Sequence, residues 1–333
     1  MKIGNLFIFA LSSILISAFI FCPERATGSI RAGLFYFSSV LVPSLFPITF
    51  MTSFVMKTTL KDLRKGQKSS IFFIFFFSLI GGYVIGAKLI SDALREGAIT
   101  KKQGEMLSLF CVNGGVGFII TAVGTGIFGS QKAGLLLYAS GALYSVLGFL
   151  VFLPKISKGG GFCGAAYQKP ISVVFCETVA ETAQVLINIA GFVILFSAVN
   201  SYLSGTKLAF LTDFFEITTA VNDDHSLPYL SMLLGFGGVS VILQILSVMK
   251  GAVRIKPFLI SRLLHAGFSF AFTYVFIKIF KISLPVAALQ KAVVMPYYDR
   301  FCVSLFAVVS MIMLILSLEG KNRGGNLRED LLQ

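Results

Sequence analysis

The residues of this sequence that could do chemistry lie beside two glycine-rich interruptions of apolar segments, about half a chain apart. The residues of these interruptions that we assign to a binding site are Gly81, Gly82, Gly86, Lys88, Gly237, Gly238, Ser240 and Gln244. A helix that breaks inside hydrocarbon must find new partners for its freed backbone groups, so breaks persist where they are buried in protein or line a wet cavity. Paired breaks therefore predict a substrate site near the middle of a bilayer.

Lys88 is the charged residue that follows the first interruption. Because a charge at the bilayer centre costs about 2.5 to 3.5 kcal/mol on insertion scales, this side chain should face a cavity or snorkel to the membrane surface. Helix N-termini at the breaks add unpaired N–H donors and a partial positive charge, and this combination favours an anionic ligand. The alternatives are that Lys88 snorkels and that the glycines serve close helix packing, for example Gly82 with Gly86.

Further polar residues inside the apolar segments complete the predicted lining, and they are Asn113, Gln184, Asn188, Glu216, Thr218 and His265. Gln184 and Asn188 lie one helical turn apart on one face. Glu216 is a candidate proton or cation site if it is embedded in the membrane, and it could instead sit at the interface. Arg262 precedes His265 by about one turn and lies near the start of its span, so we expect it to snorkel. Interhelical hydrogen bonds explain each amide without any function, and His265 is equally well explained as a packing residue.

Composition determines the class of protein. With 56% hydrophobic residues, 13% charged residues and a mean hydropathy of +0.87 over 333 residues, the chain is too apolar for a soluble globule. We predict an all-α polytopic membrane protein with about 8 to 10 transmembrane or re-entrant segments in two pseudo-repeated halves, which we expect to be inverted. The net charge of +13 lies in short loops typical of a membrane protein, which disfavours nucleic acid as a partner.

Apolar runs of bilayer length predict the individual spans. These runs cover residues 3–22, 32–56, 70–94, 106–128, 133–153, 183–203, 229–249, 258–279 and 301–318. The run 3–22 is interpreted as a retained helix, because no A-x-A-like cleavage site follows it. The apolar piece 208–221 is too short to cross alone and is predicted to be a half-helix or part of a re-entrant loop. Loop charges do not decide whether the two broken segments re-enter or span.

The order of spans and loops is similar in the two halves. Each half has a span, a short segment, a glycine-broken span, a basic loop and two more spans. We therefore predict an N-terminal transmembrane helix at 1–30, a first repeat at 31–153, a linker and amphipathic segment at 154–182, a second repeat at 183–318 and a polar C-terminal tail at 319–333.

The sequence contains no familiar enzyme or metal motif. A P-loop, an HExxH pair and a nucleophile elbow are absent, and two histidines without paired carboxylates leave hydrolysis without residues to perform it. The five cysteines show no CxxC spacing and are interpreted as packing residues. We predict no catalytic residue, no metal site, no cofactor and no enzyme activity, with an intramembrane lipid-modifying enzyme as the alternative.

Short motifs in collinear order resemble those of a known family. They are Cys22-Pro23-Glu24, Val42 to Pro47, Gly82 to Lys88, Gly191 to Ser197, Glu216 to Thr218, Gly235 to Ser240 with Gln244, and Arg262 to His265. Together they resemble the YlbJ-type sporulation integral membrane proteins, which carry nucleoside-recognition (Gate) domains. The two predicted repeats would then be Gate-like.

This resemblance implies a function. The expected activity is transport of a small anionic solute by alternating access, with dipicolinic acid moving from mother cell toward forespore, in a multi-pass protein of the cell membrane, at the outer forespore membrane. Its partners would be this substrate, the lipid bilayer, and further copies of the chain or other sporulation membrane proteins. The alternatives are a non-transporting scaffold for spore envelope or cortex assembly and a permease for nucleoside-like solutes.

The sequence departs from the family pattern in its first half. The family tends to have proline where Val84 stands and again near Val116. Valine allows a continuous helix where proline would force a break. We therefore expect the break at Gly237 to match the family pattern, and the break at Gly81 to be closer to an ordinary kinked helix.

Overall fold

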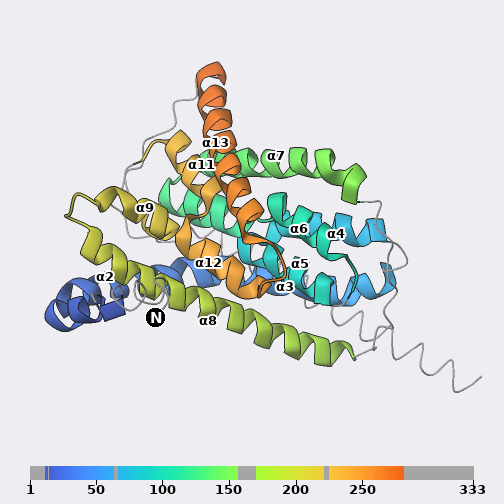
Figure 1. Cartoon of the computed structure of the whole chain (residues 1–333), viewed down its shortest axis with the longest axis horizontal. Coiled ribbons are helices and arrows are strands. Elements are labelled where there is room, and N and C mark those ends of the chain that lie inside the picture. The colour runs from blue at the N-terminus through green and yellow to red at the C-terminus, as the bar shows by residue number, and fades with distance from the viewer. Residues whose placement is uncertain are drawn as a thin grey trace, which may run out of the picture.

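The computed structural model describes residues 12–13, 15–63, 67–95, 97–156, 170–220 and 225–280. Within these residues the chain forms helices joined by turns and contains no strand, which confirms the predicted all-α class (Figure 1). In chain order the elements are α2 (Pro23–Tyr36), the π-helix η1 (Phe37–Leu41), α3 (Val42–Leu63), α4 (Gln67–Gly81), α5 (Tyr83–Arg95), α6 (Lys101–Phe110), the π-helix η2 (Gly117–Ile127), α7 (Gln131–Ile156), α8 (Ile171–Leu203), the 3-10 helix η3 (Ala209–Leu211), α9 (Thr212–Phe215), α10 (Ile217–Ala220), α11 (Leu227–Phe236), α12 (Gly238–Met249) and α13 (Ile255–Phe280).

Five helical stretches among the described residues are long and apolar enough to cross a membrane. They are Pro23–Thr58, Gln131–Lys155, Ile171–Leu203, Leu227–Met249 and Ile255–Phe280. Many large apolar side chains point outward from these helices, as a lipid-facing surface requires. The chain is therefore a multi-pass membrane protein. Half of the predicted span 3–22, all of the span 301–318 and the tail 319–333 lie outside the described residues.

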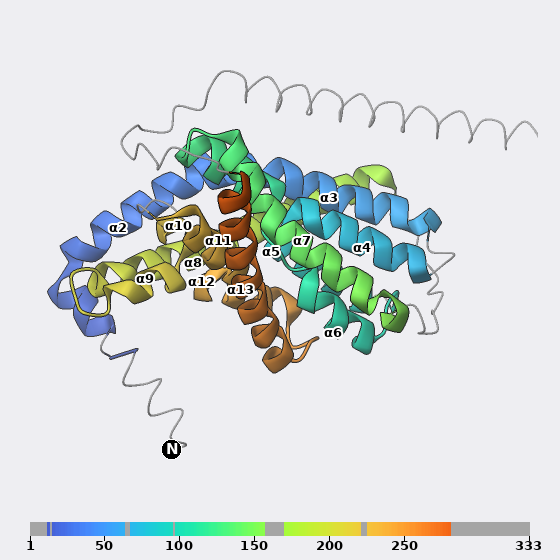
Figure 2. The ribbon, with the colours of Figure 1, turned by 90° about the horizontal axis from the view of Figure 1, so that it is seen from above.

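The interrupted helices pack inside the bundle. α8 runs along one side of the molecule, where it contacts α2, α3 and α12 (Figure 1). α5 contacts α4, α6 and α12, so the segments that follow the two glycine breaks touch each other. α13 stands steeply across the long axis and packs on α11 and α7 (Figure 2). Both breaks are thus surrounded by protein.

Both predicted glycine breaks are present, and each contains a left-handed glycine; at the second break the next residue, Gly238, also has a positive φ, of +76°. Gly82 separates α4 from α5 with φ of +94°, and Gly237 separates α11 from α12 with φ of +91°. Only glycine adopts this left-handed conformation at low cost. The expectation that the first break would be an ordinary kink is therefore wrong. The left-handed Gly82 interrupts the helix, and no proline is needed at Val84.

A third interruption crosses the first at very close range. The chain is not helical between α6 and Val116, so the Asn113-Gly114-Gly115 stretch interrupts the predicted span 106–128, as its polar and glycine residues indicate. A Cβ atom added to Gly82 would lie 2.8 Å from the backbone nitrogen of Gly115, and one added to Gly115 would lie 2.9 Å from the Cα atom of Gly82. The two backbones therefore touch directly, which only glycine at both positions permits.

Two further predicted boundaries differ from the structure. The segment 172–182 and the span 183–203 form one helix of 33 residues, α8, because no residue between them interrupts its hydrogen bonding. The piece 208–221 contains η3, α9 and α10, and the two short helices α9 and α10 are separated by Glu216, whose backbone is extended at φ −137° and ψ 110°. The division of the chain into two repeats stays a prediction.

A left-handed glycine can be required for its backbone conformation or for close packing. Alanine substitutions at three glycines should separate these two contributions to stability. Gly82→Ala combines a left-handed conformation, worth about 1 to 2 kcal/mol, with overpacking against Gly115, worth about 1 to 3 kcal/mol. Gly237→Ala pays only the conformational cost, because the nearest atom to its Cβ would be 3.6 Å away. Gly191→Ala, on α8 with nothing within 4 Å, should be neutral or stabilising by up to about 1 kcal/mol.

Thermal unfolding of the purified protein in detergent checks this order. We expect the apparent melting temperature to fall most for Gly82→Ala, less for Gly237→Ala, and not at all for Gly191→Ala. Equal melting temperatures for the Gly82 and Gly237 variants would show that the backbone crossing at Gly115 contributes nothing.

Candidate functional site

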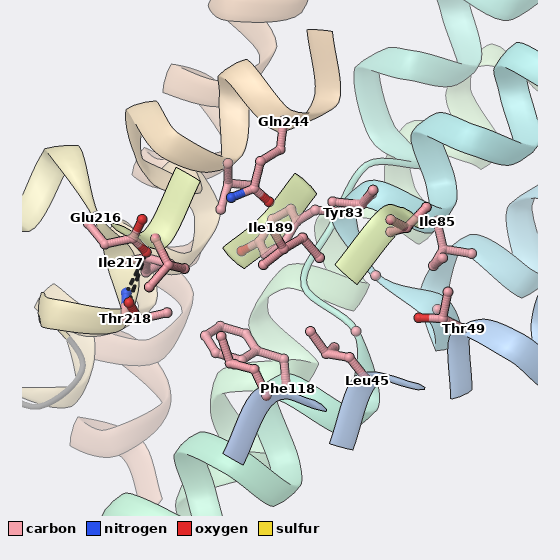
Figure 3. Close-up of a pocket in the computed structure, with 18 residues that line it drawn as sticks. Leu45, Thr49, Tyr83, Ile85, Phe118, Ile189, Glu216, Ile217, Thr218 and Gln244 are labelled. Atoms are coloured by element: carbon pink, nitrogen blue, oxygen red, sulfur yellow. Dashed lines mark hydrogen bonds between the residues drawn. The ribbon is translucent and has the colours of Figure 1, made fainter. Parts of the chain in front are cut away.

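A cavity of about 70 Å³ lies between the interrupted helices. Its apolar wall includes Leu45 of α3, Phe118 of η2 and Ile189 of α8, as Figure 3 shows. Its polar groups come from Thr49, Glu216, Thr218 and Gln244. The backbone of the first break also reaches it, since Gly81, Gly82 and Gly115 are among the lining residues. The cavity is therefore mostly apolar, with a few polar groups converging on it, as small-molecule sites are.

Glu216 places a carboxyl group without a cationic partner at this cavity. The side chain is 1% exposed, and its Oε1 atom accepts hydrogen bonds from the backbone nitrogen of Thr218 at 3.1 Å and from the Thr218 hydroxyl at 3.0 Å. Its Oε2 atom has no hydrogen-bond partner, although the hydroxyl of Ser240 lies beside the carboxyl group. Within the described residues, Glu216 forms no ion pair. A buried carboxylate without a cationic partner is costly, and its persistence points to a function.

Gln244 brings the helix after the second break to the same cavity, while Ser240 lies behind it and is not part of the lining. Both lie on α12, Ser240 two residues after its start and Gln244 one turn later, and both are buried. The Gln244 amide donates to the Ser240 hydroxyl at 3.2 Å. The Gln244 side chain points into the cavity from the side opposite Phe118 (Figure 3). The amide oxygen and nitrogen of Gln244 can therefore reach a bound molecule.

Tyr83 joins the two breaks directly. It is the first residue of α5, and its hydroxyl donates a hydrogen bond to the backbone carbonyl oxygen of Leu234 near the end of α11. The last carbonyl groups of an interrupted helix have no intrahelical partner, so this bond satisfies a group that the second break has freed. Sequence reasoning missed Tyr83, although a tyrosine directly after a helix-breaking glycine was a signal that could have been used.

The helix starts around the cavity supply further donors. α5, η2 and α12 all begin beside it, and the first N–H groups of a helix have no intrahelical acceptor. These ends carry partial positive charge. The described lining residues include no lysine or arginine. Any attraction of this cavity for an anion therefore comes from backbone groups and from neutral side chains.

The structure places Lys88 in an ion-pair network away from the cavity lining. Its ammonium group lies 2.6 Å from a carboxylate oxygen of Glu181 and 2.8 Å from one of Asp92, and Lys57 also contacts Glu181 at 2.5 Å. This network links α5 to α8 and α3, and the charge of Lys88 is balanced there by carboxylates. Free snorkelling of Lys88 is therefore not observed.

The two predicted amides of α8 lie on its outer face. Gln184 and Asn188 are exposed and bond to each other at 3.3 Å, while Val185 and Ile189 of the same helix line the cavity. The predicted pairing of the amides is present, but the structure does not bring them to the site. A shift of one residue along a helix rotates a side chain by about 100°, and the sequence did not show which face of α8 is buried.

His265 and Arg262 are both fully buried, and neither lines the cavity. The His265 ring stacks on Tyr144 with centroids 4.3 Å apart, which matches a packing role. The expectation that Arg262 snorkels is wrong. Its guanidinium donates to the carbonyl oxygen of Leu109, in the last turn of α6, at 3.2 Å and to that of Val112 in the non-helical stretch that follows.

The remaining predicted residues support the breaks rather than the cavity surface. Asn113 is buried, and its Oδ1 atom accepts from the backbone nitrogen of Gly114 at 2.8 Å inside the third interruption. Gly86 packs against the Cys111 carbonyl oxygen, and Gly238 lies over the turn between α9 and α10. Within the described residues, no group of three His, Cys, Asp or Glu side chains is arranged to hold a metal ion.

Fold and site together define a class: a helical multi-pass membrane protein in which interrupted helices enclose a partly polar internal cavity. The chain is similar to the sporulation integral membrane protein YlbJ of Bacillus subtilis (strain 168), with 24% identity over 335 aligned residues that cover 81% of this chain and 82% of YlbJ. This likeness confirms the resemblance to YlbJ-type proteins that the motifs predicted. No protein-family profile and no solved structure matches the chain.

Removing the hydroxyl of Tyr83 should loosen the link between the breaks. Tyr83→Phe leaves the Leu234 carbonyl without its donor, and leaving a buried acceptor unpaired costs about 1 to 3 kcal/mol. Tyr274→Phe, which removes the same atom from an exposed ring, should be neutral. Thermal unfolding measures both variants, and equal melting temperatures would show that the Tyr83 hydroxyl does not stabilise the break.

The role of Lys88 can be tested through its partner on α8. If Lys88 serves mainly to pair with Glu181, then Lys88→Gln and Glu181→Gln should each cost about 1 kcal/mol or less, and the double variant should cost less than the sum. Additive costs in thermal unfolding would contradict the pairing. Loss of ligand affinity in Lys88→Gln alone would instead support the anion-binding role predicted from the sequence.

Proposed function

We propose that this protein is a sporulation-associated membrane transporter that moves a small anionic solute, dipicolinic acid, across the membrane by alternating access. The observation that carries the proposal is a cavity between two helices interrupted at left-handed glycines, lined by Gly82 of the first break, by Gln244 of the helix after the second, and by the buried Glu216 carboxyl group without a cationic partner. Interrupted helices that meet around a site inside the bilayer are the usual construction of secondary transporters.

A scaffold would not need this construction. Glycine pairs that serve only packing bring helices together without leaving a cavity, and a buried carboxyl group without a cationic partner lowers the stability of the fold. Glu216 lies at the cavity surface, where a transport cycle can use its charge. These features favour transport over a purely structural role.

The chemistry of the cavity suits a small aromatic acid. Leu45, Phe118 and Ile189 offer apolar surface for a flat ring. The helix starts of α5, η2 and α12 offer N–H groups for carboxylates. Dipicolinic acid combines both parts, because it is a pyridine ring that carries two carboxyl groups. The sporulation setting is supported by the printed name of the Bacillus relative, and the outer forespore membrane is the location that we propose.

Transport requires the cavity to change size. At about 70 Å³ the space admits water, whereas sites for small organic molecules enclose about 300 to 1,000 Å³. The left-handed residues Gly82 and Gly237 are the points at which the flanking helices can tilt, because the helical hydrogen bonding is already interrupted there. Opening toward one side and then the other would give alternating access.

Dipicolinate flux through purified protein in liposomes tests the proposal. Terbium trapped inside the vesicles becomes luminescent when it binds dipicolinate, so the signal reports entry. We expect entry well above that of protein-free vesicles, with no inhibition by excess uridine. A folded protein that gives no flux would overturn the proposal, and uridine uptake would favour the nucleoside-like permease.

Two matched variants connect flux to the cavity. Phe118 lines the cavity and is 7% exposed, whereas Phe128 is 8% exposed and does not line it. Phe118→Leu should raise the KM for dipicolinate several-fold, because it removes ring contact with the substrate. Phe128→Leu should leave KM unchanged at a similar cost in stability. Equal effects would place the substrate elsewhere.

A further inference from the structure

A second and larger cavity, of about 460 Å³, lies where α2 packs against α8 and the start of α9. Its lining consists almost entirely of hydroxyl, amide and glycine groups, among them Ser29 and Tyr36 of α2, Asn200 and Ser201 of α8, Thr212 and Thr218. We call it the hydroxyl cavity. The exposed Ser204 lies at one part of its lining and the buried Thr218 at another, so it leads from the surface inward.

The hydroxyl cavity presents mainly hydrogen-bond acceptors. The hydroxyls of Ser201 and Thr212 donate their protons to backbone carbonyl oxygens, both at 2.6 Å, so their lone pairs remain for other donors. The Asn200 amide nitrogen donates to the Thr212 carbonyl oxygen at 3.2 Å, while its Oδ1 atom is buried without a partner. The Tyr36 hydroxyl is also unpaired. Polar cavities of this size with unsatisfied groups hold water.

The lining of the hydroxyl cavity reaches Thr218, which is hydrogen-bonded to Glu216. Thr218 lines both cavities, and its hydroxyl donates to Glu216 Oε1 at 3.0 Å. Tyr36 is the titratable side chain of the α2 helix that is close enough to interact with the Glu216 charge. Asp213, on the adjoining turn, is instead engaged by Tyr229 at 3.1 Å and by His225 at 3.2 Å. Among the described residues, no lysine or arginine pairs with Glu216.

We propose that the hydroxyl cavity is a proton pathway to Glu216 and that the protein moves protons together with its anionic substrate. This inference rests on the proposed transport function and names its coupling ion. A proton from the water in the hydroxyl cavity binds the Glu216 carboxylate and converts it into a neutral carboxylic acid. No bond other than this O–H bond forms or breaks, and the proton leaves to the opposite side when the group ionises again.

The position of Glu216 makes proton and anion binding depend on each other. The carboxyl group lines the substrate cavity, so an ionised Glu216 repels a carboxylate substrate there. Protonation removes the repulsion and provides an O–H donor to the substrate. Each anion that binds therefore favours a proton on Glu216, and each proton favours the anion.

A pH gradient across liposomes that contain the purified protein tests whether proton and dipicolinate movement are coupled. The exchange of external for internal dipicolinate at equal pH measures transport, and net accumulation with an acidic exterior measures coupling. We expect the gradient to raise accumulation by the wild type at least fivefold, a protonophore to abolish the gain, and a sodium gradient to have no effect. Exchange without any response to the pH gradient overturns this inference alone, and so does accumulation driven by sodium. A folded protein without exchange overturns both this inference and the proposed function.

Variants assign the coupling to these residues. Glu216→Gln keeps the shape of the side chain but cannot take up a proton, so accumulation should lose its response to the gradient and exchange should lose its pH dependence. Asn200→Leu should block the hydroxyl cavity and slow gradient-driven uptake about tenfold, whereas Asn200→Ser should restore it. Thermal unfolding confirms that each variant is folded. A fully pH-responsive Glu216→Gln protein, or equal rates for the two Asn200 variants, contradicts the assigned pathway.

Discussion

The structure depends on how backbone groups are satisfied where helices break inside the bundle. A peptide group without a partner costs several kcal/mol in hydrocarbon, on the order of a whole side chain's burial. The backbones at Gly82 and Gly115 pass in direct contact, which closes the first break against the third. The Tyr83 hydroxyl then donates to a carbonyl group near the end of α11, and the Arg262 guanidinium donates to carbonyl groups in the last turn of α6 and just beyond it. The interruptions are therefore held by one connected set of contacts.

This arrangement leaves one buried carboxyl group beside the breaks without a cationic partner among the described residues. With the carbonyl groups at the breaks capped by Tyr83 and Arg262, the side chains left facing the cavity are few, and the carboxyl group of Glu216 stands out because it is buried without a cation. The basic residues that might have balanced it are used elsewhere: Lys88 pairs with Glu181, and Arg262 binds backbone oxygens. The absence of a cationic partner in the described part of the chain is the physical basis for the proposed proton exchange at Glu216 and for the proposed coupling of proton and solute movement.

The two cavities divide the work that the proposed cycle requires. The smaller one has apolar walls and a few convergent polar groups, which suits recognition of an organic solute. The larger one is lined mostly by hydroxyl-bearing and amide side chains, of which Ser201 and Thr212 donate to the backbone and Tyr36 is unpaired, and such a lining suits water. Thr218 belongs to both linings, and its bond to Glu216 is the point at which they meet. A rearrangement of the short helices on either side of Glu216 would therefore affect both cavities at once.

The sequence alone determined the helical membrane class and the positions of the Gly82 and Gly237 breaks, because hydropathy and helix-breaking glycines are local signals. It also named Glu216 as a candidate site residue, but it left open whether this carboxyl group is buried or lies at the interface. Tertiary structure decided which groups meet. In the folded protein Gln184 is exposed, and the ammonium group of Lys88 forms an ion pair with Glu181. The physical reason is that the rotation of each helix and the choice of ion-pair partner depend on packing between segments far apart in the chain, which a single sequence does not encode locally.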